Sequence, residues 1–369
     1  MFKTSFTILF AFIGALSPIG IGETGLRDQA VAADTVRVER PDNVLSVMTY
    51  NIKGLPWPIA LDRDDALDRI GERLAMMRRD RRQPHIVLMQ EVFSSKAAEV
   101  AAVAGYRHAV MGPDSALRTT MAMDGIDRRY IKAARWDRGE NMGKSLNSGL
   151  MILSDYPVLG IERMAFPDFA CAGFDCLANK GVLIVHLNIP GVGRVSVVNA
   201  HLNARSAAMV PVARSQQAFA RQVDLMAGFV ARHVPQGQAM ILGGDMNIGS
   251  DRQRQASFFT AFARSGLSFI TPALGGASQA LAHGQLAEAT MRRDLLHAAR
   301  HGKDWLFGRD ASGAALPVRR AQVPFGNEVT GEPLSDHFGY VIDYAPKRYG
   351  AHERIHFAER GELPRLGGR

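Results

Sequence analysis

Short runs of apolar residues recur along the chain between turn-forming residues, and such runs predict β-strands. They occupy residues 45–51, 86–91, 149–154, 181–187, 195–201, 239–245 and 338–344. Between them, two segments space apolar residues three and four apart, as one face of a helix requires. Those residues are Leu67, Ile70, Leu74 and Met77, then Phe219, Val223, Met226 and Val230. Glycine-containing links such as residues 190–193 favour antiparallel hairpins, so the pattern predicts an α/β fold of two mixed sheets flanked by helices.

One catalytic domain over residues 40–345 accounts for this pattern, because no internal repeat or linker divides it. Two segments are harder to assign. Residues 112–144 are rich in Arg, Asp and Met, and we expect a long insertion over one face of the domain. Residues 273–300 are rich in Ala, His and Gln, and we expect them to be partly helical. The tail, residues 346–369, holds six basic and three acidic residues, which predicts a flexible basic end.

The first residues have the order of an export signal. Lys3 precedes an almost wholly apolar run over residues 6–16, and small residues at 30–32 offer a cleavage site. We therefore predict a signal peptide over residues 1–32 and a secreted or periplasmic protein. The alternative is an uncleaved N-terminal tether, because the gap between the apolar run and the cleavage site is long.

Composition narrows the class of protein further. The 369 residues are 47% apolar and 22% charged, which excludes a disordered or fibrous chain and a small disulfide scaffold. Lys plus Arg number 44 against 36 Asp plus Glu, and the net charge of +8 suits a polyanion or an anionic membrane surface. The two cysteines, Cys171 and Cys176, could close a local disulfide in an oxidising compartment; free thiols are the alternative.

Polar residues suited to metal and phosphate chemistry end most of the predicted strands. They are Asn51, Glu91, His201, Asp245, Asn247, Asp336 and His337. Any one of them alone could be a turn former or a helix cap. Because neighbouring strands deliver their ends to one rim of a sheet, the set together predicts one site.

Local spacing gives some of these residues more specific interpretations. Glu91 closes an apolar run, where a carboxylate is costly unless it is paired or bound to a cation. Asp245 and Asn247 are two apart and point the same way on an extended chain. Asp336 and His337 are neighbours that point to opposite sides, so another carboxylate should orient His337, and we expect it to be Asp304.

Six short motifs carry a resemblance to a known family. They are TYN at 49–51, QE at 90–91, HLN at 201–203, GGDMN at 243–247, KDWLF at 303–307 and SDH at 335–337. In this order they resemble the endonuclease/exonuclease/phosphatase superfamily. The resemblance implies a four-layer α/β/β/α sandwich like that of deoxyribonuclease I. It also implies phosphoester hydrolysis with a divalent cation, usually Mg²⁺, with Mn²⁺ or Co²⁺ as substitutes.

Within that superfamily the chain looks closest to the neutral sphingomyelinases, including bacterial sphingomyelinase C. The similar segments are residues 49–58, 149–157 and 171–185. Two features depart from the family: Ala200 replaces the usual Thr, and the aromatic membrane-inserting hairpin of haemolytic members is not evident. The resemblance implies a phospholipid partner at a membrane surface, sphingomyelin first, and we expect a monomer.

The resemblance also implies roles for individual residues. Glu91 would be the main metal ligand, assisted by Asn51 and Asp336. His337, held by Asp304, would be the general base. The expected contacts to the attacking water, the phosphoryl oxygens and the substrate come from Asp245, Asn247, His201, Lys180, Asn203 and Trp57. For Lys180 an exposed position at a strand end, and for Trp57 packing within a turn, are the alternatives.

Two other functions compete with the lipid hydrolase. A secreted nuclease of the same fold would use a basic track beside the cleft, and its candidates are Arg118, Arg128, Arg129, Arg135 and Arg138. A catalytically silent binding module is the third interpretation. The complete set of motif side chains argues against it.

Overall fold

The computed structural model describes residues 44–55, 60, 63–284, 286, 289–328 and 331–346. Within them the strands are β1 Leu45–Gly54, β2 Ile86–Val92, β3 His108–Met111, β4 Met151–Ser154, β5 Val158–Ala165, β6 Gly181–Ile189, β7 Gly193–His201, β8 Ala239–Asp245, β9 Asp304–Arg309, β10 Val318–Phe325 and β11 Gly339–Tyr344. The helices are α1 Arg63–Arg79, α2 Ser95–Ala104, α3 Gly125–Lys132, α4 Val212–His233, α5 Arg252–Arg264, α6 Gly276–Ala282 and α7 Ala289–His301. The predicted signal peptide and nearly all of the basic tail lie outside the described residues.

The strands form two mixed sheets. The first has the order β10-β11-β1-β2-β4-β3 and the second the order β5-β6-β7-β8-β9. All seven strands predicted from the sequence are present. The four that the pattern missed, β3, β5, β9 and β10, are the edge strands of the two sheets. Edge strands face solvent along one side and carry more polar residues, so their apolar runs are interrupted.

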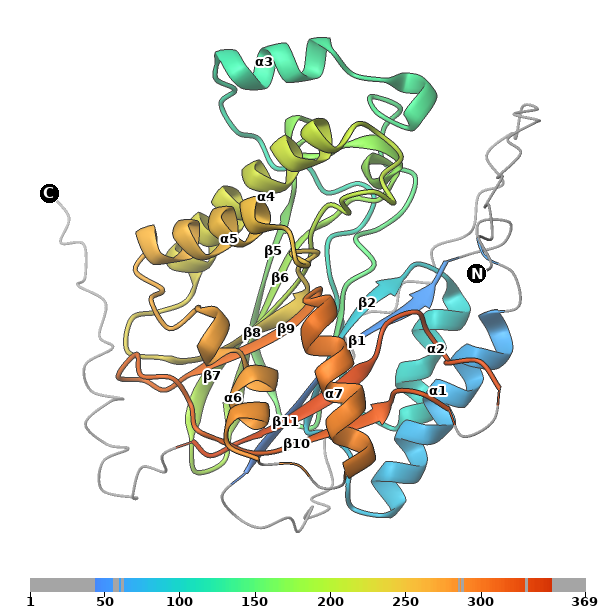
Figure 1. The fold of residues 1–369 in the computed structure, drawn as a ribbon, viewed down its shortest axis with the longest axis vertical. Coiled ribbons are helices and arrows are strands. Elements are labelled where there is room, and N and C mark those ends of the chain that lie inside the picture. The colour runs from blue at the N-terminus through green and yellow to red at the C-terminus, as the bar shows by residue number, and fades with distance from the viewer. Residues whose placement is uncertain are drawn as a thin grey trace, which may run out of the picture. The chain divides into compact units, whose positions relative to one another are not determined.

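Three layers of apolar side chains hold the sheets and helices together. The middle layer lies between the sheets and includes Val47 and Ile86 of the first with Val185 and Ile241 of the second. The outer face of the first sheet packs against α1 and α2. The outer face of the second sheet packs against α4 and α5 (Figure 1). The expected four-layer sandwich is therefore confirmed.

The strand directions bring one set of ends to a common rim. β1 pairs with β2 in parallel, and β7 pairs with β8 in parallel. A hydrogen bond between Asn51 of β1 and Asp245 of β8 shows that the ends of both pairs lie at the same rim. β11 runs antiparallel to β1, and β9 runs antiparallel to β8 with Asp304 opposite Asp245. Those two strands therefore begin at the rim where the others end.

The two segments that resisted assignment contain helices. Residues 273–300 form α6 and most of α7, which bring Ala280 and Leu295 into the middle layer beside the edge strands β9 and β10. Residues 112–144 contain α3 and a short 3₁₀ helix, Trp136–Arg138. Tyr130 of α3 packs against Ala218 of α4. None of the helices in the described part of the chain has the length and apolar character to cross a bilayer.

Candidate active site at the rim of the two sheets

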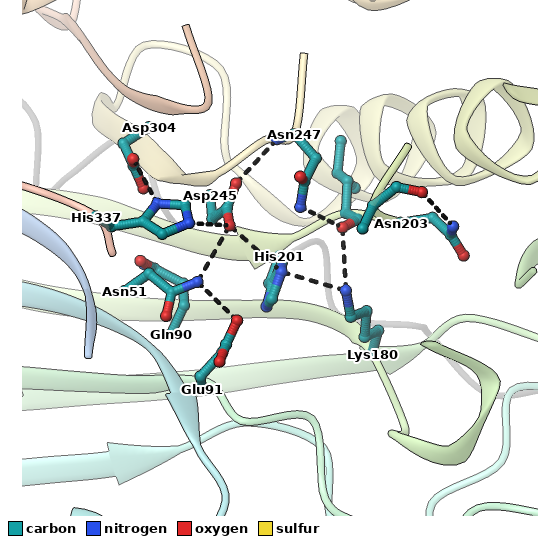
Figure 2. Close-up of polar contacts among 12 residues, drawn as sticks. Asn51, Gln90, Glu91, Lys180, His201, Asn203, Asp245, Asn247, Asp304 and His337 are labelled. Carbon is teal, nitrogen blue, oxygen red and sulfur yellow. Dashed lines mark hydrogen bonds and ion pairs between the residues drawn. The ribbon is translucent and has the colours of Figure 1, made fainter. Parts of the chain in front are cut away.

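Asn51 at the end of the first sheet joins two carboxylates from different sheets. Its Nδ2 donates to Glu91 Oε1 at 2.9 Å and to Asp245 Oδ2 at 3.1 Å (Figure 2). Its Oδ1 accepts the backbone N–H of Lys53 at 3.1 Å. This orientation of the amide follows from the chemistry, because the reversed amide would place its oxygen against two carboxylates.

A second chain of contacts runs through His337. Its Nδ1 donates to Asp304 Oδ2 at 2.7 Å, and its Nε2 lies 3.6 Å from Asp245 Oδ2. All three side chains are buried. The contact between Asp304 and His337 that the sequence predicted is thus present. Asp245 contacts both His337 and Asn51.

A third group lies on the other side of Asp245. His201 Nε2 is 3.4 Å from Asp245 Oδ2 and 3.2 Å from Lys180 Nζ. Lys180 is buried, and its ammonium also donates to Asp175 Oδ2 at 2.9 Å. Of the two interpretations of Lys180, the structure excludes the exposed strand-end position.

Buried amides and a hydroxyl fix these groups across the two sheets. Gln90 Nε2 of the first sheet donates to Asn199 Oδ1 of the second at 2.8 Å. Asn199 Nδ2 in turn donates to the main-chain oxygens of Met89 and Met151. Ser335 Oγ donates to the main-chain oxygen of Asn51 at 2.7 Å. Buried hydrogen bonds of this kind hold one arrangement of the rim.

Arg254 ties together the two loops that follow β7 and β8. Its Nη1 donates to the main-chain oxygens of Asn203 at 2.7 Å and Asn247 at 2.8 Å. The side chain is fully buried, and its guanidinium lies 4.3 Å from the ring centre of Phe219. Among the described residues, no carboxylate lies within ion-pair distance of it. Backbone and amide oxygens therefore satisfy this cation.

The charges at the rim depend on one another. Burial opposes the charged form of His337, but Asp304 and Asp245 outweigh burial and raise its pKa to about 10. Burial also opposes the charged form of Asp245, yet His337, His201 and Lys180 bring its pKa to about 2. Burial, with the nearby Lys180, lowers the pKa of His201 to about 3, so this ring is neutral at physiological pH.

Glu91 has the properties of a cation ligand. Burial raises its pKa, and the bond from Asn51 compensates only in part. Its φ of 60° is left-handed, a conformation that costs energy in a non-glycine residue and is found mainly at functional sites. Carboxylate and amide oxygens at such a rim match a hard divalent cation that keeps several waters. Glu91 therefore fits the metal that the resemblance implies, whereas Asn51 turns Nδ2 toward Glu91 and would join the cation only through Oδ1.

Asp245, Asp304 and His337 also form a possible metal-binding group, with one ligand atom of each within 4.8 Å of the others. A cation within this triad would displace the bond between His337 Nδ1 and Asp304, which joins two buried groups at 2.7 Å. The Glu91 side of Asp245 therefore fits a cation better than this triad does.

Several predicted residues take positions other than those expected. The Asp336 side chain is 61% exposed, and its ion pair is with Lys53 at 3.9 Å. In the described structure no hydrogen bond or ion pair joins it to Glu91 or Asn51. Its expected place as a metal ligand therefore lacks support from the geometry.

Asn203 was expected at the phosphate but is fully buried. Its Oδ1 accepts the N–H of Ala172, and its Nδ2 donates to the main chain of Ala204, so it shapes a loop instead. Asn247 Nδ2 donates to the main chain of Leu202, which occupies one hydrogen of the amide expected to meet the phosphate. Trp57 lies outside the described residues.

The disulfide between Cys171 and Cys176 is formed, as the export signal favoured. Asp175 lies within its loop, where Oδ2 accepts from Lys180 and from the backbone N–H of Ala204 at 2.6 Å. Sequence reasoning assigned no site role to Asp175. It also missed Asn199 and Arg254, because an isolated amide in a strand or a basic residue in a helix gives no signal of burial.

The two-sheet sandwich and the acidic and histidine side chains at its rim define a hydrolase architecture of the deoxyribonuclease I-like class. The model of the endonuclease/exonuclease/phosphatase family matches residues 48–337. The chain therefore belongs to this family.

Individual relatives add detail. A sphingomyelinase of Mycobacterium tuberculosis is 25% identical over 312 residues, which cover 81% of this chain and 52% of the relative. The chain thus spans about half the length of the curated relatives it matches. The structure of sphingomyelinase C from Streptomyces griseocarneus has a TM-score of 0.54 and 19% identity, covering 81% of this chain and 99% of that one. A mutant Staphylococcus aureus beta toxin with bound magnesium ions has a TM-score of 0.54 and 14% identity, covering 82% and 99%.

Proposed function

We propose that this chain is an exported, Mg²⁺-dependent phosphodiesterase that hydrolyses the head-group phosphodiester of a choline phospholipid, sphingomyelin first. The observation that carries the proposal is the chain of contacts from Asp304 through His337 to Asp245, next to the Asn51 and Glu91 pair. It combines a proton-carrying group with a cation-binding carboxylate in a member of a phosphoesterase family. The sphingomyelinase relatives favour a lipid substrate.

The side chains of the rim divide the chemistry. Asp304 keeps a proton on Nδ1 of His337, so that Nε2 is the nitrogen that exchanges a proton with the reacting oxygen. Asp245, facing that nitrogen, orients the attacking water. Lys180 and the neutral ring of His201 stabilise charge on the phosphoryl oxygens. Glu91, with Asn51 through its Oδ1, would hold a divalent cation, which would neutralise negative charge at the rim.

The nuclease alternative has less support. Two of the five arginines of its basic track, Arg135 and Arg138, pair with Asp137, at 2.6 and 3.7 Å. Charges neutralised within the same loop contribute little to phosphate binding. The hydrogen bonds and ion contacts that join Asp304, His337, Asp245 and Asn51 also argue against a catalytically silent module, because such a module would not need these side chains held together.

The decisive experiment is release of phosphocholine from sphingomyelin vesicles, run beside nicking of plasmid DNA. We expect metal-dependent phosphocholine release that chelation abolishes and Mg²⁺ restores, with no nicking. His337→Ala is the inactive control. Salt-sensitive nicking without phosphocholine release would replace the lipid hydrolase with the nuclease, and full turnover after metal removal would refute the metal site.

Export is part of the proposal. The disulfide supports an oxidising compartment. Expression of the full chain followed by N-terminal sequencing of the extracellular or periplasmic product tests it, and we expect the product to begin near Ala33. A reduced, uncleaved protein retained in the cytoplasm would contradict it.

A further inference from the structure

Large apolar side chains that are exposed in the described residues concentrate in two segments. Three of them, Met76, Val103 and Leu159, lie elsewhere. The other six, which we call the apolar rim, are Met123, Ile126, Trp136, Met142, Met209 and Val212. Trp136 is the most exposed residue of the apolar rim, at 73%. Exposed apolar residues that gather in this way mark an interaction surface more often than scattered ones do.

Contacts through Arg214 connect the two segments that carry the apolar rim. At the start of α4, Arg214 Nε donates to both carboxylate oxygens of Glu140, at 2.6 and 2.9 Å. Its guanidinium lies 3.9 Å from the ring centre of Tyr130 in α3. Phe174 N, in the disulfide region, donates to the main chain of Ala208 at 3.1 Å. Residues 123–142 and 205–214 therefore form one packed unit, in which α3 lies beyond α4 (Figure 1).

Helix α3 leaves one large apolar residue exposed while it buries a charged one. It turns Asp127 and Tyr130 inward, where Asp127 pairs with Arg221 at 2.7 Å. Ile126 is left exposed together with Arg128. A helix that served only to cover the domain would bury its apolar side chains. Here the exposed face of α3 combines an apolar residue with basic ones.

The charge around the apolar rim is positive. Residues 112–144 hold seven basic and five acidic residues. Two of the acids, Asp127 and Glu140, are buried in ion pairs with arginines outside the segment. The exposed basic residues are Arg118, Arg128, Arg129, Lys132 and Arg135, of which Arg135 pairs with Asp137. Tryptophan and aliphatic residues flanked by Lys and Arg match the interfacial layer of a phospholipid bilayer, which offers both apolar chains and phosphates.

The packed unit is continuous with the candidate active site. Gly173 N donates to Glu140 at 2.9 Å, and two residues further on Asp175 holds Lys180 at 2.9 Å. A few bonded residues therefore separate the apolar rim from the ammonium that we assign to the phosphate.

We propose that the apolar rim inserts into the interfacial layer of a phospholipid bilayer and holds the active-site entrance against the membrane. The inference rests on the proposed lipid hydrolase function. A second copy of the chain is a poorer occupant, because self-association would place Arg128, Arg129 and Lys132 against like charges.

Binding is measured separately from turnover, by sedimentation of the full chain with vesicles of phosphatidylcholine and phosphatidylglycerol that contain no sphingomyelin. The rim variant is Trp136→Ser with Met142→Ser, and the matched control is Met76→Ser with Leu159→Ser, since all four side chains are exposed apolar ones. We expect the rim variant to lose roughly tenfold or more in vesicle affinity, as the loss of two inserted apolar side chains requires. The control should bind as the wild type does, and both variants should hydrolyse a water-soluble phosphocholine ester normally.

The outcomes separate the two proposals. Unchanged vesicle binding of the rim variant, or equal loss in the control, would overturn the docking surface. If light scattering shows that the rim variant loses self-association while its vesicle binding is unchanged, the apolar rim contacts a second copy of the chain. That result would also overturn the membrane-docking surface. Rim-dependent binding without any lipid hydrolysis would keep the docking surface and refute the proposed function. If the double variant fails to fold, Ile126→Ser replaces it.

Discussion

Replacing Asp304 with Asn should lower the unfolding free energy of the metal-free protein near pH 6 and leave it almost unchanged near pH 10. The pKa of His337 is about 10 in the folded chain, against an ordinary value of 6.5. This difference corresponds to up to about 5 kcal/mol of folding free energy that depends on protonation of the ring. Because the folded pKa is the higher one, the contribution is complete below pH 6.5 and is lost as the pH rises toward 10.

Removal of one neighbouring carboxylate charge typically changes a pKa by about 1–3 units. Asp304→Asn should therefore cost about 1.4–4 kcal/mol of unfolding free energy near pH 6 and almost nothing near pH 10. Urea unfolding in the presence of chelator at both pH values measures this, and the ring-proton resonances of His337 report its pKa directly. Asp343→Asn is the matched control, since Asp343 is buried and pairs with Arg320, which does not titrate in this range.

An equal loss of stability at both pH values would refute the pairing, as would an unchanged pKa of His337 in the Asn variant. The pairing also has a kinetic consequence. Asp304→Asn and His337→Ala should each lower turnover by roughly 10² or more, and their effects should not add in the double variant.

Three further predictions concern the surroundings of this pair. Glu91→Gln keeps the bond from Asn51 but removes the charge, so calorimetry should show Mg²⁺ affinity reduced by about 10²; unchanged affinity would exclude Glu91 as a ligand. Replacing both Cys171 and Cys176 with Ala opens a short loop and should lower the unfolding free energy by about 2 kcal/mol in urea; no measurable change would contradict this. Arg254→Met should lower kcat about tenfold or more in protein that is still folded by circular dichroism, because the loops after β7 and β8 lose a common anchor. Arg254→Lys should restore little, since one ammonium cannot match the guanidinium geometry; full activity of the Met variant would leave Arg254 a structural residue only.

How well the sequence predicted a strand depended on where the strand lies in its sheet. Central strands such as β7 and β8 are covered on both faces, so their apolar runs are continuous and were found. Edge strands are less fully buried: β10 has two consecutive arginines, and only the last two residues of β5 are buried. Their pairing is a tertiary property that a local pattern does not contain.

The sequence predicted some residues of the site and missed others, as it did for the strands. Residues at strand ends could be found because strand direction alone brings them to one rim. Asp304 was found as the partner of His337 by asking which carboxylate could reach the ring. Arg254 was missed, since its two carbonyl partners come from loops whose approach only the folded chain defines. Asp336 was expected among these residues, but its side chain is exposed and pairs with Lys53, a direction that the strand pattern does not fix.

The active-site rim of the two sheets is assembled from segments far apart in the chain, and this has a consequence for synthesis. Asn51 meets Asp245 and Ser335, which are 194 and 284 residues away. On the ribosome, a nascent chain that has reached β8 lacks both His337 and β11, the strand that pairs with β1 in the first sheet. The set of side chains at this rim therefore forms only after synthesis has passed residue 337. Under the proposed export, a chain that folds only after leaving the producing cell would assemble this site outside the cell and not within it.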